Sequence, residues 1–136
     1  YVHTDSDPEL LKFMLGTYDG LVLAGTGSGN YPTKIKDVLE NYTGECTVVR
    51  ASRVLEGAVF DSDVFDSKKV TIPAYKFSAQ KARILLMLAL NCTKNHEIIK
   101  SFFQEYWKNF SCIVNNFVNA IIIYRLLQDR RLLCSN

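Results

Sequence analysis

The sequence has few of the residues that build metal or nucleic-acid sites. Its two histidines, His3 and His96, stand far apart, and none of its four cysteines forms a C-x-x-C pair, so the spacing of a zinc site is absent. The 16 basic and 14 acidic residues leave a net charge of +2, and no basic run exceeds two residues. Because phosphate binding needs a clustered basic surface, we expect no nucleic-acid partner and no metal.

Long apolar runs are also missing. The run from Ile84 to Leu90 is far shorter than the ~20 residues that cross a bilayer. The apolar stretches after Trp107 are interrupted by Asn115, Asn116 and Asn119, whose amides are costly in hydrocarbon, so we expect no membrane partner. Tyr1 is not followed by a charged and then an apolar leader segment. We therefore expect a fragment of a longer protein, and no signal decides between a cytoplasmic and a periplasmic location.

The composition is that of a globular domain, with 48% hydrophobic residues among 136. Tyr1 to Ser52 reads as a strand end, a helix, a strand, a helix and a strand. The first helix starts at Pro8 and ends at Gly16 or Gly20; the second, "TKIKDVLENY", is capped by Thr33 and ends at Gly44. The strands are "GLVLAG" and "CTVVRAS". This alternation predicts an α/β fold: a small parallel sheet flanked by helices in three layers, of the flavodoxin or Rossmann type.

The second half of the sequence is less regular. Residues 53–75 read as a long connection with little periodicity. Ser78 then caps "AQKARILLMLALN", which is apolar on every side at its centre and therefore predicts a buried helix. An amphipathic helix follows over about 95–106. We divide the chain into a domain over residues 1–107 and a tail over 108–136 of different character, for which an additional helix is one interpretation.

The stretch "LVLAGTGSGNYP" at residues 21–32 is the strongest candidate for a binding site. A loop that follows a parallel strand and opens a helix is where open α/β sheets bind ligands. However, its G-x-G-x-G spacing is not the dinucleotide pattern G-x-G-x-x-G, and no Walker lysine follows, so we expect no cofactor. A tight structural turn is the alternative explanation of the glycines. Thr26 and Ser28 are potential nucleophiles, but the sequence places no base beside them.

Four segments, "YDGLVLAGTGSGNYP", "VVRASRVLEGAV", "FSAQKARILLMLAL" and "SFFQEYW", resemble the C-terminal domain of bacterial-type L-asparaginases and glutaminase-asparaginases, in the same order and spacing over residues 1–107. In that family two threonines, a lysine and an aspartate of the N-terminal domain hydrolyse the amide, and both threonine motifs are missing here. The resemblance thus implies a chain without a catalytic residue, inactive alone.

The resemblance also implies partners and site residues. In the family the C-terminal domain completes the active site of a neighbouring subunit in a homo-oligomer. Asn30 matches the asparagine that contacts the substrate and the partner's catalytic threonine, and Ser28 lies in the same loop. The family also places a glutamate against the substrate's α-amino group. Asp61 or Asp63 can serve here, although strict counting puts Val64 on that position.

The expected ligand is therefore an amino acid of the asparagine or aspartate type, and the expected partner an asparaginase N-terminal domain or second subunit. The segment around Asp61 and Asp63 departs from the family pattern, so it predicts no preference between asparagine and glutamine as the substrate. Two alternatives stay open: a non-catalytic module that binds a small ligand or a protein, and an inactive gene remnant.

Overall fold

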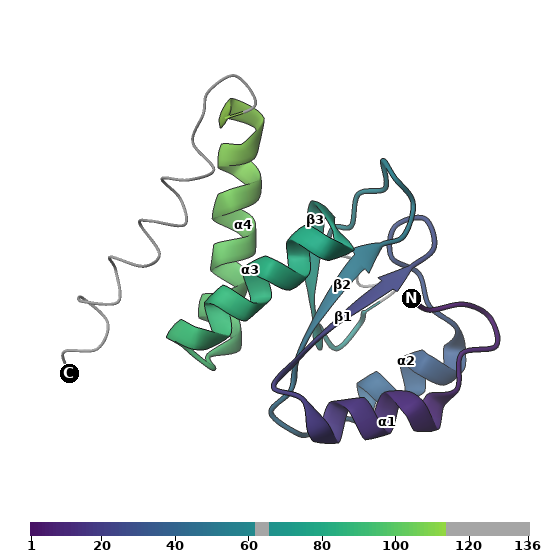
Figure 1. Ribbon diagram of the computed structural model, residues 1–136. Coiled ribbons are helices and arrows are strands. Elements are labelled where there is room, and N and C mark those ends of the chain that lie inside the picture. Colours follow the sequence, from purple (N-terminus) through teal and green to yellow (C-terminus); the bar gives the residue numbers. More distant parts are fainter. Residues whose placement is uncertain (62–65, 114–136) are drawn as a thin grey trace.

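The computed structural model describes residues 1–61 and 66–113 (Figure 1). In that part of the chain the elements are α1 (Pro8–Thr17), β1 (Gly20–Gly25), α2 (Thr33–Glu40), β2 (Thr47–Ser52), β3 (Thr71–Ser78), α3 (Ala79–Cys92) and α4 (His96–Ile113). The strands form one parallel sheet in the order β1-β2-β3. The predicted α/β class with a small parallel sheet is confirmed.

The central strand β2 divides the core into two halves. All its residues are buried, and successive side chains point to opposite faces of the sheet. Val49 and Ala51 pack in the cluster formed with α3 and α4, whereas Val48 packs in the cluster formed with α1 and α2. A strand buried on both faces explains the unbroken apolar sequence that predicted it.

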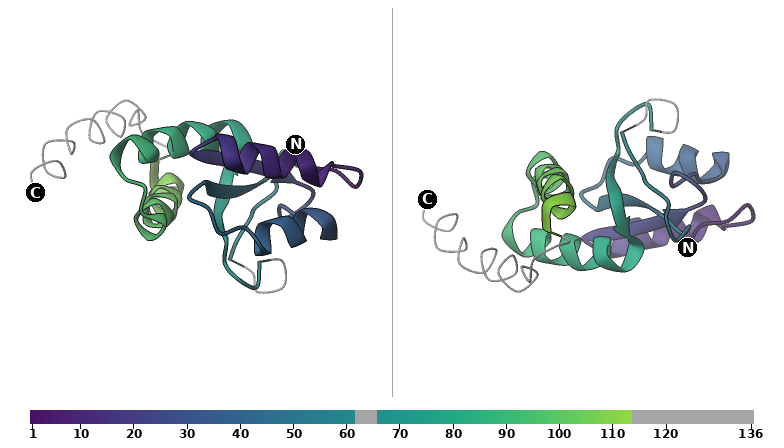
Figure 2. Two further views of the ribbon diagram at one scale, coloured as in Figure 1. Left: turned by 90° about the horizontal axis from the view of Figure 1, so that it is seen from below. Right: turned by 90° about the horizontal axis from the view of Figure 1, so that it is seen from above.

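Two pairs of helices cover the sheet. In Figure 1, α1 and α2 lie side by side below the strands, while α3 crosses the sheet and α4 stands beside it. Both views of Figure 2 place α4 at the opposite end of the described molecule from α2. This arrangement leaves the ends of β1 and β2, and the loops that follow them, at one edge of the sheet.

Helix starts are partly predicted by the sequence. Pro8 is the first residue of α1, and Ser78 caps α3 through its Oγ atom, which accepts a hydrogen bond from Lys81 N at 3.4 Å. The prediction for α2 is wrong in detail, because Pro32 holds the cap position, Thr33 is already helical, and no side chain caps the helix.

The ends of α1 and α2 and the start of the chain differ from the prediction. Helix α1 runs through Gly16 to Thr17 and stops because Tyr18 is extended, so neither predicted glycine ends it. Helix α2 ends at Glu40, before Gly44. No strand forms at the start of the chain, where Val2 makes one backbone hydrogen bond to Ala24.

Strand β3 begins inside the segment over residues 53–75 that we expected to be an irregular connection, and it extends past its end. It contains Pro73, which lacks a backbone N–H and is tolerated because β3 is an edge strand of the described sheet. Tyr75 adopts a φ of 53°, which interrupts the regular alternation of side chains. These two residues explain why the sequence pattern does not indicate a strand.

Helix α3 is less buried than predicted. Ala82, Leu86 and Ala89 face the core, but Ile84 and Met87 are 57% and 53% exposed. The helix is therefore apolar on its outer face as well, and the described residues leave that face exposed to solvent. None of the helices in the described residues combines the length and the hydropathy needed to cross a bilayer. The tail from residue 114 lies outside the described residues, and α4 continues past Trp107 to Ile113.

Candidate ligand-binding loop at the edge of the sheet

The glycine loop over residues 25–30 leaves β1 and closes on itself. The backbone N–H of Thr26 donates to Asn30 O at 3.0 Å, and the N–H of Asn30 donates to Thr26 O at 2.8 Å. Gly27 and Gly29 have φ values of 50° and 81°, a region that favours glycine. At Gly25 a Cβ atom would lie 2.2 Å from Asn30 O. The closed turn by itself therefore accounts for the three glycines.

Two side chains of β2 hold this loop. Arg50, only 1% exposed, donates through Nη1 to Ser28 O at 3.1 Å and through Nη2 to Phe60 O at 2.8 Å. The buried Ser52 donates through Oγ to Gly27 O at 2.6 Å. The loop thus takes its position from the last residues of the central strand.

The segment over residues 53–61 packs against the same loop. The backbone N–H of Arg53 donates to Gly25 O at 2.8 Å. A Cβ atom on Gly57 would lie 2.1 Å from Ser52 Oγ and 3.0 Å from Gly27 O, so only a glycine fits there. Farther along, the N–H of Val59 donates to Tyr75 O at 2.9 Å. The glycine loop and the segment over residues 53–61, which ends at Asp61, are therefore neighbours in space.

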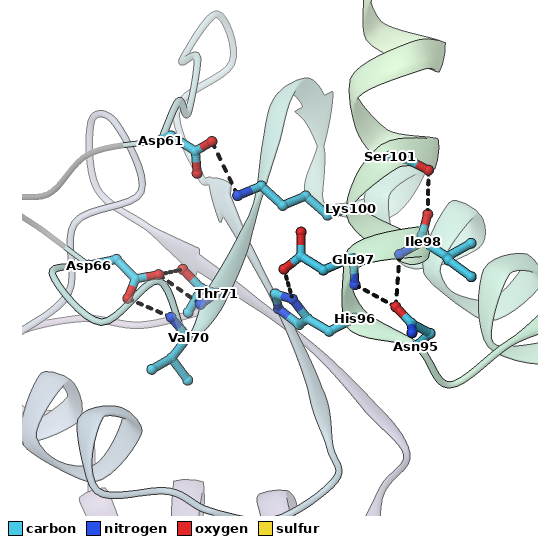
Figure 3. Close-up of polar contacts among 10 residues, drawn as sticks. All are labelled: Asp61, Asp66, Val70, Thr71, Asn95, His96, Glu97, Ile98, Lys100 and Ser101. Atoms are coloured by element: carbon cyan, nitrogen blue, oxygen red, sulfur yellow. Dashed lines mark hydrogen bonds and ion pairs between the residues drawn. The ribbon is translucent and has the colours of Figure 1, made fainter.

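The predicted site residues have different environments. Asn30 is partly buried, and its Oδ1 atom is buried with no hydrogen-bond partner. Ser28 is exposed at the tip of the loop. Asp61 forms an ion pair of 3.4 Å with Lys100 of α4 (Figure 3). Asp63 and Val64 lie outside the described residues. Arg50 links the loop that carries Ser28 and Asn30 to Phe60, the residue before Asp61.

Asp66, a buried acid that follows in the same connection, has a structural role. Its buried carboxylate accepts hydrogen bonds from Val70 N at 2.9 Å, from Thr71 N at 2.7 Å and from the Thr71 hydroxyl (Figure 3). This cap fixes the turn before β3, a common task of aspartate. The described residues contain no cluster of three or more potential metal ligands among their His, Cys, Asp and Glu side chains.

Tyr31, directly after Asn30, is a residue that sequence reasoning overlooked. Burial, reinforced by the negative charge of Asp66, raises the pKa of its phenol to about 12. The phenol therefore stays neutral at physiological pH and cannot act as a base there. The only sequence signal for it was its place at the exit of the glycine loop.

The hydroxyl of Thr26 shows no sign of activation as a nucleophile. It donates to Asn30 O at 3.5 Å, which is a contact within the loop rather than a contact with a base. At this edge of the sheet the structure therefore has a hydrogen-bonded loop with an amide side chain at its end. That geometry suits binding of a small polar ligand.

Comparison with known proteins decides the family. The sequence model of the Glutaminase/Asparaginase C-terminal domain matches residues 1–103. The chain belongs to this family. The described α/β domain therefore has the architecture of an asparaginase C-terminal domain, and the resemblance of the sequence to that family is confirmed.

Individual relatives agree with that assignment. The chain is 42% identical over 91 residues to L-asparaginase 2 of Escherichia coli, covering 65% of this chain and 26% of the relative. It is 37% identical over 109 residues to a probable periplasmic L-asparaginase of Haemophilus influenzae, covering 78% and 31%. A solved structure, a probable cytoplasmic L-asparaginase from Campylobacter jejuni, superposes with a TM-score of 0.65 at 34% identity, covering 76% of this chain and 33% of that one. This asparaginase-family chain thus spans about a quarter to a third of the length of these relatives.

Proposed function

We propose that this chain acts as the C-terminal domain of an L-asparaginase-type amidohydrolase and completes the substrate pocket of a neighbouring subunit. In this proposal the glycine loop forms one wall of the pocket, with Asn30 in contact with the amino-acid substrate. Family membership and the hydrogen-bonded loop that follows β1 support it.

The observation that carries the proposal is the unpaired amide oxygen of Asn30. A buried acceptor without a hydrogen-bond partner costs about 1–3 kcal/mol. Asn30 Oδ1 is in that state among the described residues, although the backbone N–H and C=O of Asn30 are both hydrogen-bonded to Thr26. A substrate ammonium or a partner's hydroxyl supplies the missing donor, and the amide N–H can donate to a substrate carboxylate.

The remaining contacts follow from the same geometry. Ser28 offers an exposed hydroxyl at the tip of the loop. Asp61, and Asp63 outside the described residues, are the acids proposed to bind the substrate's α-amino group. Asp61 can do so while it is paired with Lys100, because a carboxylate has two oxygen atoms and the ion pair engages Oδ2.

Amide hydrolysis by this route requires a nucleophile next to a proton acceptor. Because the glycine loop lacks this arrangement, the proposal assigns the nucleophile to an asparaginase N-terminal domain, and the isolated chain should be inactive. Fold similarity does not by itself confer activity, so a reconstitution is needed.

The test is co-expression of this chain with the N-terminal domain of Escherichia coli L-asparaginase 2, followed by measurement of ammonia release from asparagine. We expect no release from either part alone and release from the purified complex. Ammonia production by the chain alone, or the absence of any complex in a calorimetric titration of the two parts, would contradict the proposal.

A second candidate is a non-catalytic module that binds a small ligand. The contact of Thr26 with its own loop instead of a base is expected for this candidate as well, so only ligand binding and turnover separate the two. The second candidate predicts that a small ligand other than asparagine, aspartate or glutamine raises the melting temperature of the chain, while the complex with the N-terminal domain shows no turnover. An inactive remnant would show neither response.

A further inference from the structure

Arg50 is an unusual residue to find under a binding loop. Its side chain is 99% buried, yet the ion pairs of the described residues do not include it. Removing a guanidinium from water is costly unless its donors are well placed. A smaller apolar residue would avoid that cost, so the charge and the planar donor group require an explanation.

The two hydrogen bonds of Arg50 connect two separate segments. Nη1 binds Ser28 O in the glycine loop, and Nη2 binds Phe60 O in the segment after Gly57. A guanidinium presents its N–H groups in a rigid plane, so the positions of two acceptors bonded to it are fixed relative to each other. Lysine has no such plane and cannot define both carbonyl positions at once.

The packing around Arg50 reinforces this connection. A Cβ atom on Gly29 would lie 3.0 Å from Arg50 Cγ and 3.1 Å from Val59 Cγ2, so the loop rests directly on the aliphatic part of the arginine and on Val59. The residue that touches these atoms is the one immediately before Asn30. A displacement of Arg50 therefore moves the backbone from which the Asn30 side chain projects.

Ser52 adds a second hydrogen bond from the same strand. It lies two residues after Arg50, hence on the same face of β2, and binds Gly27 O, the carbonyl next to that of Ser28. Its Oγ atom also accepts from Val54 N at 3.0 Å, so it ties the loop to the start of segment 53–61.

We propose that Arg50 is a positioning residue that sets the glycine loop and segment 57–61 at a fixed separation and so orients Asn30, with Ser52 as its auxiliary. The claim about loop position stands on the contacts above, whereas its consequence for substrate binding rests on the proposed function. Neither residue touches the substrate in this proposal.

The first test is amide hydrogen exchange, followed by NMR, in the full chain with the substitutions Arg50→Lys and Ser52→Ala. We expect exchange at residues 26–30 and 57–61 to accelerate by about tenfold or more, as loss of a buried hydrogen bond promotes local opening. The amides of β1 and of α3 should keep their relative protection. The matched control is Leu86→Ala, which removes core contacts on the other face of the sheet.

The pattern of exchange decides the proposal. Acceleration spread evenly over all elements in the Arg50 and Ser52 variants, as expected for Leu86→Ala, would show a role in global stability only and would overturn it. Unchanged exchange in the loop would overturn it as well. Two substitutions of different severity are used. If Arg50→Lys fails to fold, hydrogen exchange in the Ser52→Ala variant still tests whether the side chains of β2 hold the loop.

The second test uses the complex with the N-terminal domain. Arg50→Lys is expected to raise KM for asparagine by about tenfold with a smaller change in kcat, because it misplaces a binding group rather than the nucleophile. Equal KM values for the variant and the unmodified complex would contradict the link to Asn30. If the unmodified complex has no activity, the proposed function fails, while the exchange experiment still decides the role of Arg50.

Discussion

Thr26 and Asn30 are joined by a pair of backbone hydrogen bonds of 3.0 and 2.8 Å, each donating to the carbonyl of the other. The bonds close the glycine loop directly after β1 and force its inner residues into a tight turn. Because these two bonds use only backbone atoms, the side chain of Asn30 is available for other contacts.

The turn depends on Gly29. Substitution Gly29→Ala places a Cβ atom at a φ of 81° and within 3.1 Å of Arg50 Cγ and Ala51 O. We expect a loss of about 1–3 kcal/mol in the free energy of unfolding, measured by urea denaturation.

Gly16 provides the matched control for this glycine. It lies within α1, and a Cβ atom there meets nothing within 4 Å. Gly16→Ala should therefore stabilise the chain by about 0.5–1 kcal/mol, since alanine favours the helix. Equal effects of the two substitutions would contradict the assigned loop geometry.

Cys46 should react slowly with alkylating reagents. Burial, with a contribution from the charge of Asp19, raises the pKa of its thiol from 9.0 to about 11. Since only the thiolate reacts, alkylation by iodoacetamide at pH 8 should be about 100-fold slower in the folded chain than in urea, and should accelerate as the pH rises toward 11. Peptide mapping by mass spectrometry separates Cys46 from the other cysteines.

The same shift predicts the pH dependence of stability. The folded chain holds the Cys46 proton more tightly than the unfolded chain, so stability is retained below pH 9 and decreases as the pH rises from 9 through 11. Cys46→Ala should remove this part of the alkaline decrease. A decrease of the same size in the variant would contradict the assignment to Cys46.

Asp61 has two possible roles, an ion pair with Lys100 and a contact with the substrate, and variants of the two residues distinguish them. Because Asp61 is 42% exposed, a double-mutant cycle with Asp61→Asn and Lys100→Met should give a coupling of only about 0.2–1 kcal/mol, reduced by salt. In the reconstituted complex, Asp61→Asn should raise KM for asparagine, whereas Lys100→Met should not. Similar KM values for both variants and the unmodified complex would restrict Asp61 to the ion pair.

The sequence predicts the first half of the fold well, for physical reasons. The strands β1 and β2 are short apolar runs because a covered parallel sheet buries both of their faces. Strand β3 escapes prediction because Pro73 and the left-handed Tyr75 obscure its pattern. The exposed face of α3 escapes it because periodicity alone cannot say whether an apolar surface is covered in this chain.

For the candidate site, the sequence predicts the loop but not what holds it. The glycines and Asn30 are visible as a motif before a helix. The role of Arg50 depends on the backbone carbonyls of Ser28 and Phe60. Because every residue has a backbone carbonyl, the sequence pattern cannot indicate which ones an arginine will bind. Likewise, the sequence pattern does not show that Asp66 caps the turn before β3, because the donors to its carboxylate include the backbone N–H groups of Val70 and Thr71.

The most direct measurement of the central claim is the effect of Asn30→Ala on the reconstituted complex. The substitution keeps both backbone bonds to Thr26 and removes a buried amide oxygen that has no partner, so the melting temperature of the chain should not fall. Asn41→Ala, in which a surface amide at the end of α2 is lost, is the matched control.

We expect Asn30→Ala to lower kcat/KM for asparagine by about 10- to 100-fold at unchanged stability, because a substrate contact is lost, and Asn41→Ala to leave kcat/KM within about twofold. An unchanged kcat/KM in the Asn30 variant, or a loss that merely follows a lowered melting temperature, would contradict the claim that this chain provides the substrate contact of an asparaginase site.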